Sequence, residues 1–451
     1  MSALLKMSRS GSLLILFSLI LISGCSDQVL GTSSESEAPA ESKVRNAHLF
    51  DQAIKAPGKF GEQTAIVFAI DPYLVVNEYE VVDRYEVVDR YEVVDRYEVV
   101  DRYEVVDRYE VVDRYEVVDR YEFTHTFYGY SLWVSTQYLD EILAAMEDDP
   151  MIAWVEPVFP VQSEPGQRNA AGTTQKLPWS ITDVGAPASW SVSGDGQGEV
   201  DIDIFMIDTG VSNRDLNVVD SRDYASAGTV ADDNGHGTAV AGIAAAADNA
   251  SGIVGVAPGA RIHSYRVFDA DGFGDDTYVV AALEDVLQWR RANPDNPAVV
   301  NLSLGAEIGR EQTALDDAVQ SVVDAGITVV VAAGNAGVDA AMVTPAHVKD
   351  AITVGAYDRS HTFESYSNYG RFIDVNAPGT DIFSLAPGHN YAVMSGTSLA
   401  AGHVTGAAAL YLAENPGASP KQVSKALQRA SQKTIRKVPR GTSKFSLWVG
   451  N

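Results

Sequence analysis

Short apolar runs alternate with longer segments over the second half of the chain, and this alternation limits the fold more than any other feature of the 451 residues. We predict strands near residues 202–207, 261–267, 299–304, 327–332 and 351–354. Helices are predicted to follow Gly237, Asp275, Glu311 and Ser398. Strands that alternate with helices form a parallel sheet covered by helices on both faces. The expected fold class is therefore α/β, with a doubly wound parallel sheet.

One serine stands where a nucleophile would be placed. Ser398 ends the small, flexible turn 395–398 and precedes the apolar run 404–412, so its hydroxyl is predicted in the first turn of a buried helix. A serine hydroxyl is a weak nucleophile at neutral pH. It needs a base, a group that orients the base, and a hydrogen-bond donor for the developing oxyanion.

Three further motifs supply these groups. Asp208 opens an Asp-Thr-Gly sequence at the end of the apolar run 202–207, and His236 lies in Gly-His-Gly. Asn335 closes the strand-like run 329–335. In a doubly wound sheet the carboxyl ends of strands and the starts of helices meet at one edge, so the four residues are expected to converge there.

Each of the four residues also has a purely structural explanation. Asp208 and Ser398 are types that cap turns and helices, His236 suits a loop, and Asn335 suits a Gly-Asn turn. Asp-Thr-Gly is also the signature of aspartic proteases, whose chemistry needs two carboxylates that share a proton, and the chain has no second copy. The joint occurrence of the four motifs favours the catalytic interpretation.

The motifs occur in the order Asp, His, Asn, Ser, and the sequences at 255–258 and 300–305 lie between them. Over about residues 178–450 the chain resembles the subtilisin-like serine proteases, or subtilases. The resemblance implies an endopeptidase in which Ser398 attacks the scissile carbonyl, His236 transfers the proton and Asp208 orients the imidazole. Asn335 and the Ser398 backbone N–H would donate to the oxyanion. Protein or peptide substrates follow from the same resemblance.

The resemblance also implies substrate-binding residues. Two segments resemble the walls of the first specificity pocket, and a third falls where the family has an edge strand that pairs with extended substrate. The residues concerned are Ser303, Leu304 and Gly305 for one wall, Ala333 and Gly334 for the other, and Gly272 and Gly274 for the edge strand.

Two more segments resemble the family, and one departs from it. Thr344-Pro345 resembles a segment below the pocket in which a cis proline is usual. Asp215 and the loop 249–253 resemble a calcium site, whose carbonyl ligands cannot be read from side chains, and no cofactor is required. Gly402 stands where the family usually has proline, which removes a kink-inducing ring and adds backbone freedom.

Residues 1–24 are predicted to be a lipoprotein signal peptide. Lys6 and Arg9 precede the apolar stretch 13–22, and Ile-Ser-Gly-Cys at 22–25 has the pattern of a lipobox. The stretch is too short to span a bilayer comfortably, and a short buried helix is the alternative. Because Cys25 is the only cysteine, there is no intramolecular disulfide, and lipidation is its predicted modification. The expected location is the bacterial cell envelope, with a membrane anchor at Cys25 and a tether at 25–63; Ser26 favours the outer membrane in a Gram-negative cell.

Residues 64–162 form a second predicted unit. A strand is predicted at 64–70, a hairpin over 123–135 that turns at Gly129, a helix at 137–146 and a strand at 151–158. The unit resembles the I9-type inhibitory propeptide of subtilases; an unrelated small α+β domain is the alternative. A linker would follow at 163–176 and the peptidase domain at 177–451. Self-cleavage between about residues 160 and 176 would leave the propeptide as an intramolecular inhibitor in the substrate groove and release the protease domain from its anchor.

Inside this unit the hexapeptide Tyr-Glu-Val-Val-Asp-Arg occurs in seven consecutive copies over residues 79–120. As a strand the repeat has no purely apolar face, whereas in a helix each Glu meets an Arg four residues on. The absence of Gly, Pro and Asn disfavours a series of short hairpins. We therefore favour a long helix or a mobile extension that acts as a spacer; a tyrosine-rich surface that binds partners is the alternative.

The formal net charge of −28 argues against a nucleic-acid partner. Two function classes follow from the sequence. The favoured one is an exported, lipid-anchored serine endopeptidase that processes itself. The other is a catalytically silent surface lipoprotein whose repeats bind partners.

Overall fold

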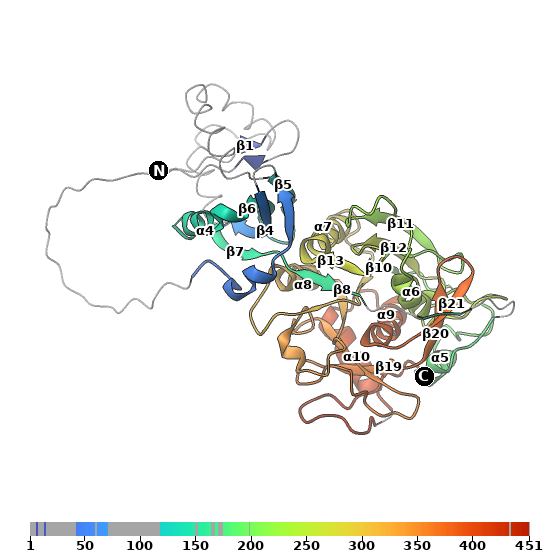
Figure 1. Ribbon diagram of the computed structural model, residues 1–451. Helices are drawn as coiled ribbons and strands as arrows, with labels where there is room; N and C mark the ends of the chain where they lie inside the picture. The colour runs from blue at the N-terminus through green and yellow to red at the C-terminus, as the bar shows by residue number, and fades with distance from the viewer. Residues whose placement is uncertain are drawn as a thin grey trace, which may run out of the picture. The chain divides into compact units, whose positions relative to one another are not determined.

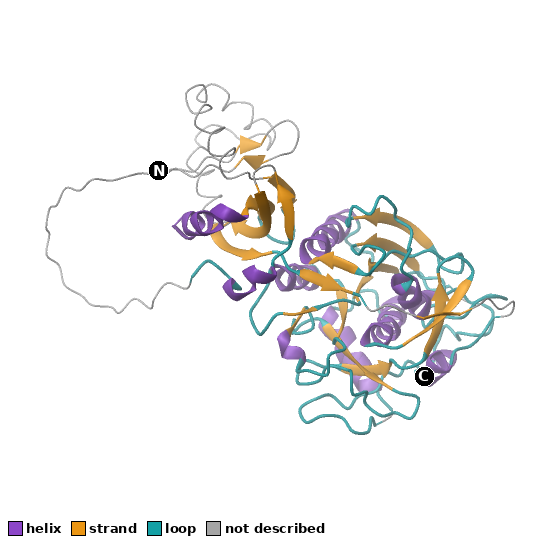
Figure 2. Cartoon of the chain, viewed as in Figure 1, coloured by secondary structure: helices purple, strands orange, loops and turns teal. Residues whose placement is uncertain are grey.

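The computed structural model describes residues 6–7, 13–14, 42–58, 61–70, 118–148, 152–163, 167–169, 175–197, 199–432 and 434–450. The chain divides into two compact units. The first comprises residues 1–122 and 128–158, and the second comprises residues 123–127 and 159–451. Figures 1 and 2 show the elements of both. Among the described residues no helix is both long and apolar enough to cross a bilayer.

A seven-stranded parallel sheet forms the centre of the second unit. Its strand order is β11-β12-β10-β14-β16-β18-β19. The strands are β10 (Asp203–Asp208), β11 (Val218–Asp223), β12 (Arg261–Arg266), β14 (Ala298–Leu302), β16 (Thr328–Ala332), β18 (Ile352–Tyr357) and β19 (Val375–Pro378). Strand order departs from chain order beside β10, as in a doubly wound sheet. The predicted α/β class is confirmed.

Helices cover both faces of this sheet. On one face α6 (His236–Ala245) packs against α9 (Thr397–Glu414), with α10 (Pro420–Ala430) beside α9. On the other face α7 (Asp276–Ala292) packs against α8 (Ala314–Asp324). Burial explains the strands, because every side chain of β10, β14, β16 and β18 is buried. These four strands and β12 are the five predicted ones, and the four predicted helices are α6 to α9.

Short elements complete the second unit. They are β8 (Pro160–Gln162), β9 (Gln167–Asn169), β13 (Phe273–Asp275), β15 (Ala306–Glu307), β17 (Val343–Thr344), β20 (Ile382–Ala386), β21 (Asn390–Met394), α5 (Trp179–Asp183), η4 (Ala186–Ala188) and η5 (Ala340–Met342). β9 pairs with β21, so residues 167–169 of the predicted linker form a strand. The Thr344–Pro345 peptide bond is cis, as the resemblance implied.

The first unit contains an antiparallel sheet with the order β3-β4-β6-β5, and β7 pairs with β4. Its elements are β1 (Lys6–Met7), β2 (Leu13–Leu14), η1 (Ala47–Gln52), β3 (Lys55–Gly58), β4 (Gly61–Ile70), β5 (Val118–Phe123), β6 (Gly129–Ser135), η3 (Thr136–Tyr138), α4 (Leu139–Asp148) and β7 (Ile152–Pro157). Strand, helix and final strand occur where the sequence predicted them. The hairpin turn is different: residues 124–128 form the connection, and Gly129 begins β6. Ile66, Phe68 and Val155 belong to the core of this unit.

Several predictions fall outside the described residues. They concern Cys25, most of the signal peptide, the predicted tether up to residue 41, and the hexapeptide copies up to residue 117. The later part of the predicted tether is different, because residues 47–52 form η1 and residues 55–58 form β3, which pairs with β4 in the sheet of the first unit. The end of the last copy is described, and residues 118–120 begin β5. At this point the repeat is a strand, because its residues continue into the sheet of the first unit rather than into a helix.

Asp374, just before β19, is a partly buried carboxyl group whose ionisation opposes folding. It accepts hydrogen bonds from the Thr353 N–H (3.0 Å) and the Gln428 amide (3.0 Å), yet burial raises its pKa to about 7. An unfolded aspartate has a pKa of about 3.9, so between pH 4 and pH 7 the folded state keeps a proton that the unfolded state has lost. The free energy of unfolding therefore falls as the pH rises through this window.

We predict that Asp374→Asn, which imitates the protonated carboxyl, becomes increasingly more stable than the parent as the pH rises from 4 to 7.5. The gain reaches up to about 3 kcal/mol. Melting temperatures measured across this range in a Ser398→Ala background, which prevents self-digestion, test the prediction. Asp324→Asn, at an exposed position on α8, is the control. A difference between Asp374→Asn and the parent that does not change with pH would refute it.

Candidate active site

Asp208 and His236 form a buried pair at the carboxyl edge of the sheet. Asp208 is the last residue of β10 and His236 the first of α6. Asp208 Oδ1 lies 2.7 Å from His236 Nδ1, and both side chains are fully buried. The same oxygen accepts a hydrogen bond from the Thr209 N–H (2.7 Å). A carboxylate at Nδ1 fixes the imidazole orientation and leaves Nε2 for proton transfer.

Gly237 permits this close approach. A Cβ atom at Gly237 would lie 3.0 Å from the Asp208 carboxylate and would collide with the Gly210 carbonyl oxygen. The glycine after the histidine is therefore needed so that α6 can begin directly against the turn that follows β10.

Ser398 is the second residue of α9 and is almost completely buried. Its Oγ lies 3.4 Å from the Ser303 carbonyl oxygen, and its own carbonyl accepts a hydrogen bond from Ser303 Oγ (3.2 Å). The nucleophile predicted from the sequence is thus held beside the first of the two predicted pocket walls.

The Asn335 side chain is oriented by the residue before Ser398. Asn335 Oδ1 accepts hydrogen bonds from the Thr397 N–H (2.8 Å) and the Thr397 hydroxyl (3.0 Å). Thr397 Oγ1 in turn accepts the Gly334 N–H (3.1 Å). Because the carbonyl side of the amide is used in this way, its Nδ2 side remains available to donate to an oxyanion formed at Ser398.

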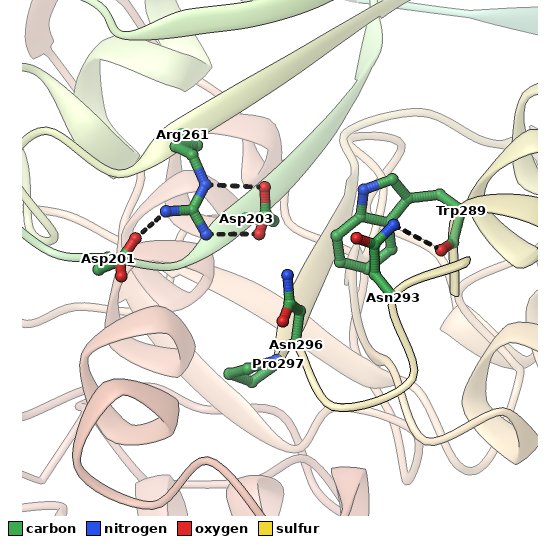
Figure 3. Close-up of a pocket in the computed structure, with 7 residues that line it drawn as sticks. All are labelled: Asp201, Asp203, Arg261, Trp289, Asn293, Asn296 and Pro297. Carbon is green, nitrogen blue, oxygen red and sulfur yellow. Dashed lines mark hydrogen bonds and ion pairs between the residues drawn. The ribbon is translucent and has the colours of Figure 1, made fainter. Parts of the chain in front are cut away.

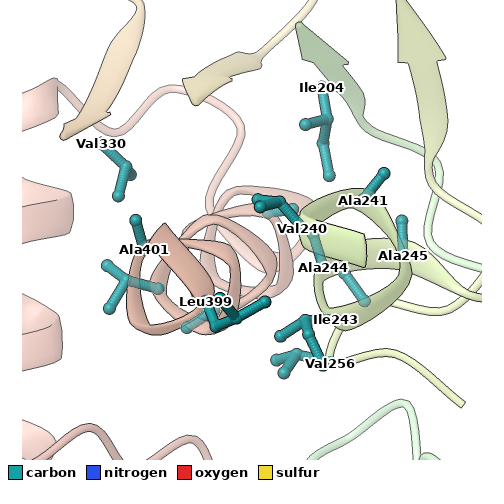
Figure 4. Packing of buried hydrophobic residues seen from close by; sticks show 14 of the residues in the cluster. Ile204, Val240, Ala241, Ile243, Ala244, Ala245, Val256, Val330, Leu399 and Ala401 are labelled. Carbon is teal, nitrogen blue, oxygen red and sulfur yellow. The ribbon is translucent and has the colours of Figure 1, made fainter. Parts of the chain in front are cut away.

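α6 and α9 pack against each other through buried side chains, among them Val240 and Ala244 of α6 and Leu399 of α9 (Figure 4). A Cβ atom at Gly402 would lie 3.0 Å from the Val240 carbonyl oxygen, and one at Gly406 would lie 2.7 Å from the Ala244 carbonyl oxygen. From the first contact to the second, the residue number rises by four on both helices, so α6 and α9 run in the same direction. Four residues earlier on each helix, the same pairing places His236 opposite Ser398, in the first turns of the two helices.

Gly402 therefore has a packing function that the sequence comparison did not reveal. α9 continues through this position without interruption. A side chain at this position would require α6 and α9 to shift relative to each other by a few tenths of an ångström.

Asp232 is a site residue that the sequence analysis missed. Its buried carboxylate accepts hydrogen bonds from the Thr209 hydroxyl (2.9 Å), the Thr238 N–H (3.0 Å) and the Gly235 N–H (2.6 Å). Burial raises its pKa, although these bonds favour the carboxylate. Asp232 thus connects the turn after β10 to the start of α6, which places His236 against Asp208. Its position four residues before His236 was the only available signal.

The predicted edge strand is occupied by another part of the same unit. β8 pairs antiparallel with β13, and Val161 lies opposite Gly274. The Ser163 N–H donates to the Gly272 carbonyl oxygen (2.9 Å), and Gln162 forms a bridge with Gly305. Residues 160–163 therefore form an additional strand between two segments that were predicted to bind substrate.

The two segments predicted to form the pocket walls are buried except at one glycine in each, Gly305 and Gly334. Ser303, Leu304 and Ala333 are buried, whereas Gly305 and Gly334 are partly exposed. Ser303 bonds to Ser398, and the Gly334 N–H bonds to Thr397. β8 pairs with β13 and bridges to Gly305, so the predicted residues of the edge strand and of both walls lie in the same part of the second unit as Ser398 and Asn335.

A separate pocket of about 460 Å³ lies at the opposite, amino edge of the sheet (Figure 3). Arg261 forms two hydrogen bonds with Asp203 (3.0 and 2.6 Å) and also contacts Asp201. Asp203 and Arg261 are the first residues of β10 and β12, whereas Asp208 is the last residue of β10. The pocket is therefore not part of the Asp208–His236 site.

Comparison with known proteins identifies the family. Residues 175–446 match the Subtilase family, Peptidase_S8. The chain belongs to the subtilase family, and it is a serine endopeptidase. The silent surface protein considered as an alternative is not favoured.

Relatives of known identity agree with this assignment. The chain is 38% identical over 301 residues to an extracellular serine proteinase of Thermus sp. (strain Rt41A), which covers 65% of this chain and 69% of the relative. It is 37% identical over 259 residues to subtilisin BL of Lederbergia lenta, which covers 57% of this chain and 92% of the relative. A solved structure of a cold adapted subtilisin-like serine proteinase matches with a TM-score of 0.50 and 35% identity, over 56% of this chain and 90% of that one.

Proposed function

We propose that this serine endopeptidase cleaves peptide bonds with Asp208, His236 and Ser398 as its catalytic triad. The observation that carries the proposal is the buried Asp208–His236 pair, 2.7 Å apart at the start of α6. The parallel packing of α6 and α9 supports it, because it brings the start of α9 to the same edge.

In the proposed reaction the Ser398 oxygen bonds to the scissile carbonyl carbon while its proton passes to His236 Nε2. The imidazolium then protonates the leaving nitrogen, the C–N bond breaks and an acyl-enzyme remains. Water repeats the sequence with His236 as base and regenerates the serine. Asp208 remains ionised and stabilises the imidazolium. Asn335 Nδ2 and the Ser398 N–H donate to the oxyanion of both tetrahedral intermediates.

Extended peptides would bind by strand addition to β13, with Gly272 and Gly274 providing backbone hydrogen bonds. The chain's own β8 supports this assignment, since it pairs with β13 through backbone hydrogen bonds. We propose that residues up to about 163 act as an intramolecular inhibitor in this position. Cleavage of a bond between about residues 160 and 176 would convert the inhibited chain into the active enzyme.

The lipoprotein signal suggests where the enzyme operates. We propose export, lipidation at Cys25 and attachment to the bacterial cell envelope, in the outer membrane if the cell is Gram-negative. The relatives include a proteinase described as extracellular, which is consistent with export. Because cleavage falls after the anchor, processing would release the protease domain while the lipid remains on the propeptide side.

Cell fractionation tests processing and release together. We expect the wild-type protease domain in the soluble fraction, and Ser398→Ala as a full-length chain in the membrane fraction. A Cys25→Ala variant tests the anchor, since the uncleaved Ser398→Ala chain should then carry no lipid. If the wild-type protease domain stays with membranes after the propeptide has been cut and has dissociated, the release mechanism is wrong.

The fold family implies a structural calcium ion, and one group of residues fits it. Asp215 Oδ1 accepts a hydrogen bond from Asn249 (2.7 Å), whereas Asp215 Oδ2 is buried without a hydrogen-bond partner. Burial raises the pKa of Asp215. Among the described residues no three His, Cys, Asp or Glu side chains gather at a metal-binding distance, so backbone carbonyls would have to contribute. We propose that Asp215, Asn249 and the carbonyl groups of residues 247–253 hold Ca²⁺ and thereby stabilise this loop.

We predict that a calcium chelator lowers the melting temperature of the Ser398→Ala chain by about 5 °C or more, because calcium stabilises only the folded state. Asp215→Asn is expected to melt at the lower temperature with or without calcium. Differential scanning calorimetry with excess calcium or excess chelator measures both. Asp201→Asn, at an exposed acidic position, should keep the wild-type calcium response. An unchanged melting temperature on chelation would exclude the site.

A further inference from the structure

The strand β21 ends four residues before Ser398 and is paired along both of its edges. β20 covers one edge, and β9 covers the other. β9 consists of residues 167–169, which belong to the predicted linker between propeptide and peptidase domain. Without this linker segment, β21 would be an edge strand that leads directly to the proposed nucleophile. An edge strand presents backbone groups that can pair with another extended chain.

The linker follows β8, which approaches Ser398 along the two segments predicted to bind substrate. β8 pairs antiparallel with β13, and Gln162 forms an antiparallel bridge with Gly305. Gly305 is two residues after Ser303, whose carbonyl oxygen lies 3.4 Å from Ser398 Oγ. Because antiparallel chains run in opposite directions, β8 runs from Gly305 toward Ser303, and so toward the nucleophile.

β9 runs away from the nucleophile. It pairs antiparallel with β21, so that Gln167 lies opposite Val393 and Asn169 lies opposite Tyr391. Since β21 runs toward Ser398, β9 begins at the end of β21 that leads to Ser398 and continues toward the far end. In Figure 1, α9 lies between β8 and β13 on one side and β20 and β21 on the other. The chain therefore approaches the proposed site along β13 and leaves it along β21, as a bound substrate would.

The two registers define positions for a substrate. A peptide in the register of β8 has one residue opposite Gly305 and, two positions later, one residue opposite Ser303, beside the nucleophile. Gln162 and Gln167 are five positions apart, so a peptide that follows both strands has its residue opposite Val393 three positions after the one opposite Ser303. With the cleaved bond directly after the residue opposite Ser303, the third to fifth residues beyond the bond pair with β21.

We infer that β21 binds the part of a protein substrate that follows the cleaved bond, by strand addition at its third to fifth residues. β9 holds this place in the uncleaved chain. The inference rests on the proposed function, because it puts the cleaved bond at Ser398. Backbone hydrogen bonds carry binding of this kind, so it adds affinity without requiring particular side chains. The preferred substrates are accordingly extended polypeptides with at least five residues beyond the bond, rather than short peptides.

Hydrolysis of internally quenched peptides by the processed wild-type enzyme tests the inference. Two peptides share the same four residues before the bond and continue for either two or five residues after it. We expect kcat/KM to be about tenfold or more higher for the longer peptide, because backbone hydrogen bonds to β21 would add to the binding of the transition state.

Methylation of single backbone nitrogens in the longer peptide identifies the mode of binding. The N–H groups of successive residues in a strand point to opposite sides. Methylation at the third, fourth or fifth residue beyond the bond should therefore lower kcat/KM in an alternating pattern. The positions whose N–H points away from β21 serve as matched controls, since they carry the same methyl group without losing a hydrogen bond.

A cross-link separates this inference from the proposed triad. In a full-length Cys25→Ala, Ser398→Ala chain, Gln167→Cys with Val393→Cys should form a disulfide under mild oxidation. Directly opposite residues of an antiparallel pair have Cα atoms about 4.5–5.5 Å apart, which a disulfide can span. Gln167→Cys with Asn390→Cys is the control and should stay reduced, because Asn390 is three residues, or about 10 Å, from Val393 along β21.

The outcomes distinguish the two proposals. If no peptide is hydrolysed, the proposed triad fails, and the cross-link still decides whether an extended segment pairs with β21. If peptides are hydrolysed with the same kcat/KM whatever their length beyond the bond, the triad stands and the inference is overturned. Absence of the disulfide between positions 167 and 393 overturns it as well.

Discussion

Ser398→Ala is expected to lower kcat/KM for peptide hydrolysis by at least about 10⁴-fold, a scale known for triad serines in subtilisins. The reason is the loss of the only atom in the proposed site that can form the acyl bond. Hydrogen bonds to the oxyanion and the binding of substrate would remain, so the variant should still bind peptides. The chain should also keep its N-terminal region, because the same serine is proposed to cut it.

Intact mass spectrometry of the purified chains and a peptide hydrolysis assay measure both effects. Ser395→Ala is the matched control, since Ser395 lies three residues earlier and its hydroxyl accepts the Asp381 N–H (3.0 Å). This control should process itself and hydrolyse peptides like the wild type. A Ser398→Ala chain that still loses its N-terminal region in the absence of any other protease would contradict self-processing.

Asn335→Ala is expected to lower kcat by about a hundredfold or more, near 3 kcal/mol, with little change in KM. The side chain is held by two hydrogen bonds from Thr397, so its amide is already oriented before substrate arrives. It would meet charge that exists mainly in the transition state, which is why binding of the ground state should be nearly unaffected.

Steady-state kinetics with a tetrapeptide p-nitroanilide substrate give kcat and KM separately. Asn390→Ala is the control, because Asn390 is exposed on β21 and its side chain bonds only locally, to the Pro387 carbonyl (3.0 Å). Turnover close to that of the wild type in Asn335→Ala would remove this amide from the mechanism. A large rise in KM at constant kcat would instead assign Asn335 to substrate binding.

The interior strands of the second unit could be predicted from sequence because they are buried on both faces. β10, β14, β16 and β18 are short apolar runs for this reason, and the sequence shows them directly. β11 was missed because it lies at the edge of the sheet, is not fully buried, and consists half of charged residues. β19, at the other edge, was missed because it has only four residues and ends in proline.

The sequence predicted the residues whose side chains take part in the proposed chemistry. It predicted less well the residues that only hold those side chains in place. Asp208, His236, Asn335 and Ser398 carry recognisable local sequences. Asp232 is one of two consecutive aspartates in a loop, and nothing local distinguishes it from its neighbour.

The most direct test of the proposed triad is covalent labelling with a fluorophosphonate, followed by peptide mapping. Such a reagent forms a bond only with a serine that is activated by a base and supported by oxyanion donors. We predict one label per processed wild-type molecule, located on Ser398, with complete loss of hydrolysis. His236→Ala should remain folded and unlabelled. Hydrolysis that persists after Ser398 is fully labelled, or inactivation by a label on another residue, would contradict the triad.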